Sequence, residues 1–339
     1  MANRRWILRT RPEGDISEGD LELIEVAIPD LDEGEILVRN IYLSVDPTNR
    51  IWMSDIDAYM PPVEVGEPMR GRTWGTVIKS RHEGFRAGDV VTGGLIWEEY
   101  SVLRHAEAVP MNLGLPLEAF TSVLGPAGMT AFWGLSDIGK PRPGETLVVS
   151  AAAGATGSVA GQIGKIMGCR VVGVAGGSLK CGYVTEQLGF DACVDHRAGN
   201  LEEQLRQACP EGIDVDFENV GGDVMDAVLG MVNNHARVVL CGLISTYNRE
   251  GDWWSPRRFR NLLFRRVSMQ GLIITDYFPR FAEALPVMAD WVGQGRISYR
   301  VDVVEGITNA PRALARIFDG NNMGKQLVKL SPAPSDIQP

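Results

Sequence analysis

The chain has 339 residues, of which 45% are hydrophobic and 22% charged, and its formal net charge at pH 7 is −10. This length exceeds what one simple core organises, so we expect two domains, and the ordinary apolar content is typical of a globular protein. The acidic balance and the lack of a basic stripe argue against nucleic acid or an anionic membrane as a partner, and no apolar run approaches membrane-spanning length.

The cysteines and the N-terminus both favour a cytoplasmic location. Residues 1–6, MANRRW, have neither the apolar core nor the cleavage pattern of a signal peptide. The cysteines form no CxxC pair, which is typical of reduced thiols and not of a disulfide framework. They are Cys169, Cys181, Cys193, Cys209 and Cys241.

The first 125 residues predict a β-rich domain. Short apolar runs such as 36–38, 41–45 and 76–78 are separated by turn signals such as Asp46-Pro47 and Glu83-Gly84. This pattern suits a compact, partly open barrel better than a helical domain.

One loop of this domain, residues 51–62 (IWMSDIDAYMPP), is unusually apolar. Over a cleft it would line a pocket for a hydrophobic substrate, although Trp52 and Met53 could equally belong to a satellite core. Tyr59 stands beside two prolines and can donate a hydrogen bond from a rigid position. Trp52, Met53 and Tyr59 are therefore candidates for a substrate site.

A strand–turn–helix–strand unit begins near residue 145. The run 147–149 predicts a buried strand, the turn AAAGATG covers 151–157, and Val159, Ile163 and Ile166 recur on one helical face before a second strand at 170–175. The turn reads AxxGxxG, a variant of the dinucleotide fingerprint, in which unpaired N–H groups at a helix start bind a pyrophosphate. The alternative is a tight turn without a ligand.

The end of the second strand bears on which dinucleotide binds. Units that bind NAD usually place an Asp or Glu there for the ribose 2′-OH. Here residues 176–180 read GGSLK, without a carboxylate, and Lys180 offers a positive charge while Ser178 offers a hydroxyl. We therefore expect NADP(H), the alternative being that Lys180 is an ordinary solvated helix residue.

The pattern continues as alternating helices and strands to about residue 294. Helices are expected at 179–188, 200–208, 223–233 and 278–294, and strands at 192–194, 213–218, 237–241 and 267–274. These elements predict a six-stranded, doubly wound Rossmann sheet whose ligands lie at the carboxyl ends of the strands. A helix at 310–318 and a last strand at 326–330 follow, and this strand is expected to return to the first domain.

The order of these parts resembles the medium-chain dehydrogenase/reductase superfamily, with a GroES-like first domain. Several strings carry the resemblance: LSVDP at 43–47, YMPP at 59–62, GMTAFWGL at 128–135, GATGSVAGQIGKIMGCRVVGVAGG at 154–177, LGFD at 188–191, ENVGG at 218–222, CGLISTYN at 241–248 and GNNMGK at 320–325. They resemble the zinc-independent branch of leukotriene B4 12-hydroxydehydrogenase/prostaglandin reductases and plant double-bond reductases, and most of all bacterial NADPH-dependent curcumin reductases. The α/β fold would comprise a GroES-like substrate domain, 1–125 with 304–339, and a Rossmann domain, 126–303.

The resemblance implies cofactor-binding positions along the second domain and in the tail. They are Thr130, Gly154, Ala155, Thr156, Gly157, Ser178, Lys180, His196, Asn219, Cys241, Gly242, Ile244, Ser245, Thr246, Tyr247, Leu272, Ile273, Ile274 and Asn322. Many relatives carry a tyrosine near the 2′-phosphate where this chain has Asp195-His196-Arg197, so His196 or Arg197 would have to replace it.

The resemblance also implies a metal-free reaction. Residues 69–75, MRGRTWG, lack the cysteine and histidine ligands of the zinc-dependent relatives. Hydride from NADPH, held in a cleft between the domains, would reduce the C=C bond of a small hydrophobic enone, with Tyr59 and the cofactor's ribose hydroxyl stabilising the enolate.

Three further expectations complete this interpretation. Trp52, Met53, Trp253, Trp254, Tyr277 and Phe278 are candidates for the substrate pocket. A homodimer is implied, formed through residues 267–274. Two alternatives stay open at this point: a zinc-free quinone reductase, and a non-catalytic, crystallin-like protein that binds NADPH.

Overall fold

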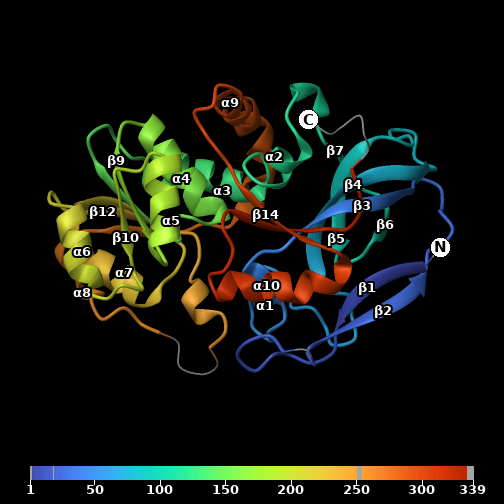
Figure 1. Cartoon of the computed structure of the whole chain (residues 1–339), viewed down its shortest axis with the longest axis horizontal. Coiled ribbons are helices and arrows are strands. Elements are labelled where there is room, and N and C mark those ends of the chain that lie inside the picture. Colours follow the sequence, from blue (N-terminus) through green and yellow to red (C-terminus); the bar gives the residue numbers. More distant parts are fainter. Residues whose placement is uncertain (1, 18, 250–253, 334–339) are drawn as a thin grey trace. The chain divides into compact units, whose positions relative to one another are not determined.

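The computed structural model describes residues 2–17, 19–249 and 254–333. Within these ranges the chain divides into two compact units (Figure 1). One consists of the residues up to 121, residues 302–322 and the chain from 326 onward, and the other consists of residues 122–301 and 323–325.

The first unit is built mainly of antiparallel strands. A hairpin of β1 (Ala2–Leu8) and β2 (Leu21–Ala27) accompanies a seven-stranded sheet in the order β14-β15-β3-β4-β5-β7, with β6 also paired to β3. The strands of this sheet are β3 (Ile36–Ser44), β4 (Arg70–Ser80), β5 (Val90–Ile96), β6 (Tyr100–Leu103), β7 (Glu107–Ala108), β14 (Val301–Glu305) and β15 (Lys325–Lys329). Because β15 pairs with β3, the last strand returns to the N-terminal part, as predicted.

Three helices accompany these strands: α1 (Thr48–Trp52), α2 (Leu117–Thr121) and α10 (Ala310–Phe318). Leu314 of α10 packs with Leu43, Met53 and Trp97 in one buried cluster. Arg50 of α1 is also buried, and its guanidinium donates to the carbonyl oxygens of Pro12 and Gly14 and to the Ser54 hydroxyl. These bonds fix the segment that leads into the apolar loop.

The second unit holds a parallel sheet in the order β10-β9-β8-β11-β12-β13. Its strands are β8 (Thr146–Ser150), β9 (Arg170–Ala175), β10 (Ala192–Asp195), β11 (Ile213–Glu218), β12 (Val232–Leu240) and β13 (Ser268–Gly271). The predicted Rossmann sheet is confirmed. The strand order reverses between β8 and β11, which is where doubly wound folds bind ligands.

Helices cover both faces of this sheet. On one face, side chains of α6 (Leu201–Ala208) and α7 (Gly222–Leu229) pack against Val148, Val172 and Val238. On the other face, α4 (Ala155–Ile166) lies so close that a side chain at Gly164 would come within 2.4 Å of Leu147. The remaining helices are α3 (Pro126–Trp133), α5 (Ser178–Gly182), α8 (Arg260–Phe264) and α9 (Phe281–Gly293).

The prediction of a helix over 223–233 is wrong at its C-terminal end. Helix α7 ends at Leu229, and β12 begins at Val232, five residues before the predicted start at 237. The register of β12 against β11 shifts after Ile213, and His235 has a φ of +65°. This irregular start, which carries the polar residues Asn233, Asn234 and His235, hides the alternation that identifies a strand.

Other elements are shorter than predicted or were missed. The predicted helix 179–188 is α5 followed by a π-helical turn at Tyr183–Gln187, and the strand 267–274 ends at Gly271. A 3₁₀ segment, Ile274–Arg280, contains Pro279, so α9 starts at Phe281 and not at 278. Strand β14 had no counterpart in the prediction. None of the helices in the described ranges combines the length and apolar character needed to span a bilayer.

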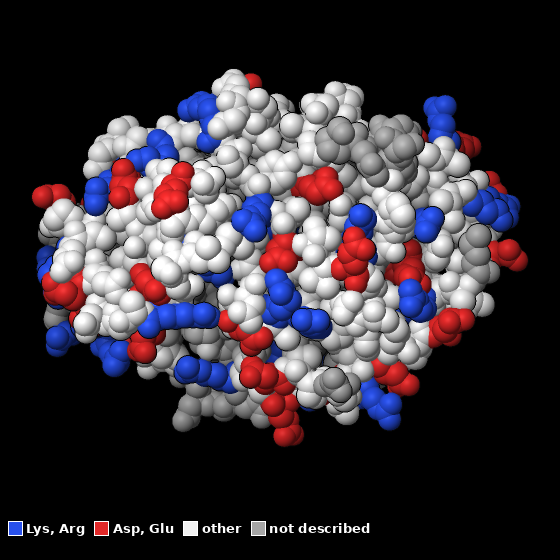
Figure 2. Space-filling model, viewed as in Figure 1, with Lys and Arg blue, Asp and Glu red and all other residues white. Residues whose placement is uncertain are grey.

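Charged side chains of both signs are interspersed over the face of the molecule in Figure 2. Several form ion pairs, such as Arg4 with Glu99 at 2.6 Å and Arg316 with Asp302 at 2.9 Å. On this face, neither sign of charge gathers into a single large patch.

Asp216 is a buried carboxyl group in the middle of β11. It lies between Val148 of β8 and Val238 of β12, it is 1% exposed, and neither carboxyl oxygen has a hydrogen-bond partner in the described residues. Burial, followed by the charge of Glu218, raises the pKa of Asp216 well above its ordinary value. Ionisation of Asp216 is therefore less favourable in the folded protein than in the unfolded chain.

We predict that Asp216→Val stabilises the second unit, because it replaces an unsatisfied carboxyl with a side chain matching its valine neighbours; the gain should be roughly 1–3 kcal/mol. A raised folded-state pKa makes the wild type less stable as pH rises above the unfolded value. The increase in Tm should therefore be larger at about pH 8 than at about pH 5.

Asp214→Val is the matched control for this measurement, since Asp214 lies on the same strand but accepts hydrogen bonds from the Thr146 N–H (2.9 Å) and the Asn233 amide (2.8 Å). It should lower Tm. A lower Tm for Asp216→Val, or a gain that does not change with pH, would contradict the assignment of Asp216 as a destabilising buried acid.

Candidate functional site

The turn after β8 leaves the start of α4 open for an anion. Gly154 is the N-terminal cap of α4, with extended backbone (φ −85°, ψ 177°), no side chain caps the helix, and its first turn has no acidic residue. The first N–H groups of a helix have no partner within it. The N–H groups of Ala155, Thr156 and Gly157 therefore face the space in front of the helix, together with the positive end of its dipole.

Only small residues fit this turn. A Cβ at Gly157 would lie 2.5 Å from the carbonyl oxygen of Ala151, and one at Gly154 would lie 3.1 Å from the same atom. The GNNMGK string also reaches this turn, because the Gly324 N–H donates to the Ala153 carbonyl at 2.8 Å. Asn322 stands two residues before Gly324. The predicted pyrophosphate position thus fits its residues.

The end of β9 is organised by a carboxylate that the sequence analysis missed. Asp195, the last residue of β10, accepts hydrogen bonds from the N–H groups of Gly177 (2.8 Å) and Arg197 (2.9 Å). These two bonds lower its pKa. The carboxylate therefore holds the Gly176-Gly177 turn, in which Gly177 has a φ of +92°.

Three basic side chains surround this turn. A Cβ at Gly176 would lie 2.9 Å from both His196 Nε2 and Arg197 Nε, so these side chains close over the glycine. Burial lowers the pKa of His196, with smaller contributions from the charges of Arg197 and Lys180. Lys180, on α5, is half-buried. This cluster, Lys180, His196 and Arg197, is suited to a doubly charged phosphate.

The ends of β8 and β11 are joined by hydrogen bonds. The Asn219 amide donates to the carbonyl oxygen of Ser150 at 2.7 Å, and the Asn219 N–H donates to the Ser150 hydroxyl at 2.7 Å. That hydroxyl donates to Glu218 Oε1 at 2.7 Å, which also accepts the N–H of Gly221 at 2.9 Å. Asn219 is thus fixed at the point where the strand order reverses.

The segment 241–247 lies beside Asn219. The N–H groups of Cys241 and Gly242 donate to the Glu218 carbonyl at 2.9 and 3.0 Å, and the Ile244 N–H donates to the Asn219 carbonyl at 3.1 Å. Ser245 Oγ is buried without a partner in the described residues and faces the Gly221-Gly222 turn. An unpaired buried hydroxyl at a strand end is consistent with a ligand that carries its own polar groups.

Other predicted cofactor residues are less distinctive. Thr130 of α3 is buried and donates its hydroxyl to the Pro126 carbonyl at 2.7 Å, which satisfies it within the helix. The Thr246 hydroxyl donates to the Leu243 carbonyl, and the Tyr247 hydroxyl accepts the Leu243 N–H. Leu272 continues the sheet through a bond from its N–H to Leu240, and Ile273 and Ile274 follow it. Ser178 is exposed at the start of α5.

In the first unit, the substrate candidates separate into exposed and buried residues. Tyr59 is 43% exposed, and its hydroxyl forms a short hydrogen bond with that of Thr48. Burial raises the pKa of Tyr59, opposed by this bond, so the phenol stays protonated. Trp52 is half-buried against the Arg70 guanidinium at 5.2 Å. Met53 is fully buried in the core, so its side chain does not offer a pocket wall.

In the second unit, Tyr277 stacks on Trp133 with ring centroids 5.5 Å apart, and the Arg280 guanidinium lies 3.8 Å from the Trp133 ring. Phe278 is 42% exposed. Trp254, a candidate for the substrate pocket, instead packs against the core on the face of the sheet that α6 and α7 cover. Trp253 lies outside the described residues.

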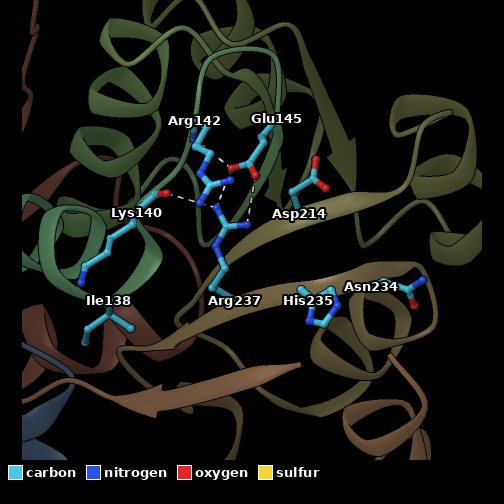
Figure 3. Close-up of a pocket in the computed structure, with 8 residues that line it drawn as sticks. All are labelled: Ile138, Lys140, Arg142, Glu145, Asp214, Asn234, His235 and Arg237. Atoms are coloured by element: carbon cyan, nitrogen blue, oxygen red, sulfur yellow. Dashed lines mark hydrogen bonds and ion pairs between the residues drawn. The ribbon is translucent and has the colours of Figure 1, made fainter. Parts of the chain in front are cut away.

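A pocket of about 380 Å³ lies elsewhere, at the amino ends of the strands (Figure 3). Glu145, which precedes β8, forms an ion pair with Arg237 of β12 at 2.5 Å. Arg237 also donates to the Gly139 carbonyl at 2.9 Å, so this arginine ties three segments together. Burial tends to raise the pKa of Glu145, but the bonds to Arg237 and to the Arg142 N–H outweigh it and lower it. The pocket is a structural junction at the opposite edge of the sheet from the predicted site.

The described residues contain no group of three or more His, Cys, Asp or Glu side chains that could hold a metal ion.

Comparison with known proteins establishes the family. The family models described as "N-terminal domain of oxidoreductase" and "Zinc-binding dehydrogenase" match residues 4–111 and 155–290. The chain is 43% identical over 339 residues to the NADPH-dependent curcumin reductase of Escherichia coli, covering 97% of each chain. It is 36% identical over 338 residues to the 2-alkenal reductase (NADP(+)-dependent) of Nicotiana tabacum, covering 98% of each.

A solved structure agrees with these relatives. CurA from Vibrio vulnificus in complex with NADPH matches with a TM-score of 0.92 and 41% identity, over 97% of this chain and 100% of that chain. The chain therefore belongs to the medium-chain dehydrogenase/reductase family of oxidoreductases, as the sequence resemblance indicated.

Proposed function

We propose that this chain is an NADPH-dependent reductase of the C=C bond in α,β-unsaturated ketones and aldehydes, working without a metal ion. The observation that carries the proposal is the 43% identity over nearly the whole length to a relative named for NADPH and for curcumin, a conjugated enone. The tobacco relative, named for 2-alkenals, supports the same substrate class. We further propose that residues 1–125 with 304–339 form the substrate domain and that residues 126–303 form the cofactor domain.

The residues that would hold NADPH follow from the site. The N–H groups at the start of α4 would bind the pyrophosphate, and the cluster of Lys180, His196 and Arg197 would bind the 2′-phosphate. Asn219 and Ser245 would hold the ribose and nicotinamide at the strand ends. When bound, NADPH supplies the hydride.

Tyr59 is the proposed catalytic donor. When a hydride adds to the β-carbon of an enone, negative charge develops on the carbonyl oxygen. A neutral phenol can donate a hydrogen bond to that oxygen, and the raised pKa of Tyr59 keeps it neutral. Trp52, Tyr277 and Trp253 are proposed to wall the substrate site, and the cytoplasm is the proposed location.

We predict that Lys180→Gln weakens NADPH binding roughly 10- to 100-fold, the loss expected for one charge-assisted contact with a phosphate. NADH lacks the 2′-phosphate, so its Kd should not change. Isothermal titration with the two cofactors measures both effects.

Lys140→Gln is the matched control, because it removes the same charge from an exposed residue at the amino ends of the strands. It should leave both Kd values unchanged. Wild-type protein that binds NADH as tightly as NADPH would remove the proposed cofactor preference.

We predict that NADPH is consumed with enones and 2-alkenals at a higher kcat/KM than with quinones, because the proposed site donates a hydrogen bond to one carbonyl oxygen. A panel of enones of increasing length, followed by the loss of NADPH absorbance, gives the comparison. Faster turnover of quinones would favour the quinone-reductase alternative, and NADPH binding without turnover would favour a non-catalytic protein.

In the same assay, Tyr59→Phe should lower kcat by roughly 100-fold, as expected when one donor to a developing oxyanion is removed, with Kd for NADPH unchanged. Tyr100→Phe, a conservative change in the same unit, should not lower it. Wild-type kcat in Tyr59→Phe would exclude the phenol from the reaction.

We also propose a homodimer formed along β13. This strand ends the described parallel sheet, and three of its four residues are exposed. Close to it in sequence, Phe259, Leu263 and Phe264 are 59%, 76% and 60% exposed, which is unusual for large apolar side chains. A second copy would cover this edge.

Sedimentation equilibrium should therefore give twice the chain mass for the wild type. Leu263→Asp places a charge within the covered surface and should yield monomers, whereas Leu95→Asp, at another exposed leucine, should not. A monomeric wild type at micromolar concentration would contradict the dimer.

A further inference from the structure

Two cysteines that the proposed reaction does not use lie side by side. Cys181 of α5 and Cys193 of β10 have their sulfur atoms 3.1 Å apart. Helix α5 lies against β10 in the fold (Figure 1), and both residues are half-buried, so that a small oxidant can reach them. Both are free thiols in the structure.

The surroundings of the pair allow the sulfur atoms to come closer. A disulfide bond is about 2.05 Å long, so about 1 Å of movement is needed. Helix α5 continues directly into the π-helical turn Tyr183–Gln187 and packs beside β10, the strand at the end of the described sheet. It follows the Gly176-Gly177 turn, whose second residue has a φ of +92°, so it can shift more easily than an element in the centre of the sheet.

The two thiols are not equivalent. The Cys193 S–H donates to the sulfur of Cys181. Burial raises the pKa of both thiols, but at Cys181 the hydrogen bond from Cys193 opposes the increase, whereas at Cys193 it adds to it. Cys181 is therefore the sulfur better able to carry negative charge and to attack first.

We propose that Cys181 and Cys193 form a dithiol that a hydroperoxide converts to a disulfide, and that the disulfide weakens NADPH binding. The Cys181 thiol gives up its proton, and its sulfur attacks the terminal peroxide oxygen. The O–O bond breaks, Cys181 becomes a sulfenic acid, and the departing alkoxide takes up the proton that Cys181 released and leaves as an alcohol. The Cys193 sulfur then attacks the Cys181 sulfur and expels hydroxide, which leaves as water with the Cys193 proton. Two thiols are oxidised, and one peroxide is reduced to an alcohol and water.

The effect on the cofactor rests on the proposed function. Lys180 precedes Cys181 on α5, and Asp195, His196 and Arg197 follow Cys193 at the end of β10. The proposed 2′-phosphate cluster is thus carried by the two elements that the disulfide would draw together. Movement of α5 against β10 displaces Lys180 from the position it holds in the reduced protein, so NADPH should lose affinity while NADH does not.

The covalent step is tested without any cofactor. The full-length protein is treated with hydrogen peroxide, free thiols are blocked, and the chain is cut after Lys180 and Arg197, which releases both cysteines in one peptide. Further cleavage after Glu186 separates the two halves unless a disulfide joins them. We expect joined halves, two hydrogen masses lighter than the sum of the reduced halves, which separate after dithiothreitol. Separate halves with blocked or over-oxidised thiols would overturn the proposal.

The functional step compares Kd values before and after oxidation. We expect Kd for NADPH to rise about fivefold, since a contact with the phosphate is lengthened and not lost, with Kd for NADH unchanged. Dithiothreitol should restore the first value, and Cys181→Ser and Cys193→Ser should show no change on oxidation. An unchanged ratio of the two Kd values in disulfide-linked protein would overturn the switch.

The two measurements also separate this proposal from the proposed function. If the reduced protein does not prefer NADPH, the proposed cofactor fails and the switch falls with it, whereas the mass of the linked peptide still decides the disulfide. If NADPH is preferred but no linked peptide forms, the proposed function stands and the dithiol is excluded.

Discussion

The carboxyl group of Glu218 organises the edge of the sheet on which the candidate site depends. It lies at the end of β11, fully buried, and one of its oxygens accepts the Ser150 hydroxyl and the N–H groups of Val220 and Gly221. These bonds join the ends of β8 and β11 at the point where the strand order reverses. Without them, the backbone groups of the ENVGG turn would be buried without partners, which is costly in a sheet interior.

A second interaction of the same kind lies beside the residues proposed to distinguish NADPH from NADH. Asp195 holds the Gly176-Gly177 turn through the backbone N–H of Gly177, just as Glu218 holds the turn after β11. Its carboxylate is thereby directed at backbone donors, so a negatively charged residue can stand close to a site for a phosphate. The basic side chains nearby, Lys180, His196 and Arg197, are those proposed to bind the 2′-phosphate. In both places an acidic residue shapes the loop, and glycine provides the space.

Much of this could be read from the sequence because the relevant signals are local. The apolar spacing of Val159, Ile163 and Ile166 identified α4, and the small residues before it identified the turn, since Gly157 leaves room for nothing larger. The return of the last strand to the N-terminal part also followed, from a strand-like segment without a following helix, although its pairing with β3 did not. The features that could not be predicted depend on contacts between residues that are distant in the sequence. The start of β12 lacks alternation. The sequence also left open whether Met53 lines a pocket or belongs to a core, because its core partners, such as Trp97 and Leu314, are far away in the chain.

The contrast between two carboxyl groups on one strand shows how the site constrains the fold. Glu218 and Asp216 point to the same face of β11, and burial raises the pKa of both, but only Glu218 has hydrogen bonds that oppose this effect. Glu218 is needed where it lies because it holds the turn that carries Asn219. Asp216 has no such partner, and the charge of Glu218 makes ionisation of Asp216 still less favourable. The sheet can retain one carboxyl group without hydrogen bonds if the burial of apolar side chains offsets its cost in folding free energy. The valines around Asp216 contribute this apolar burial. The stability of this unit therefore comes from its apolar faces, and its polar edge is the part proposed to bind NADPH.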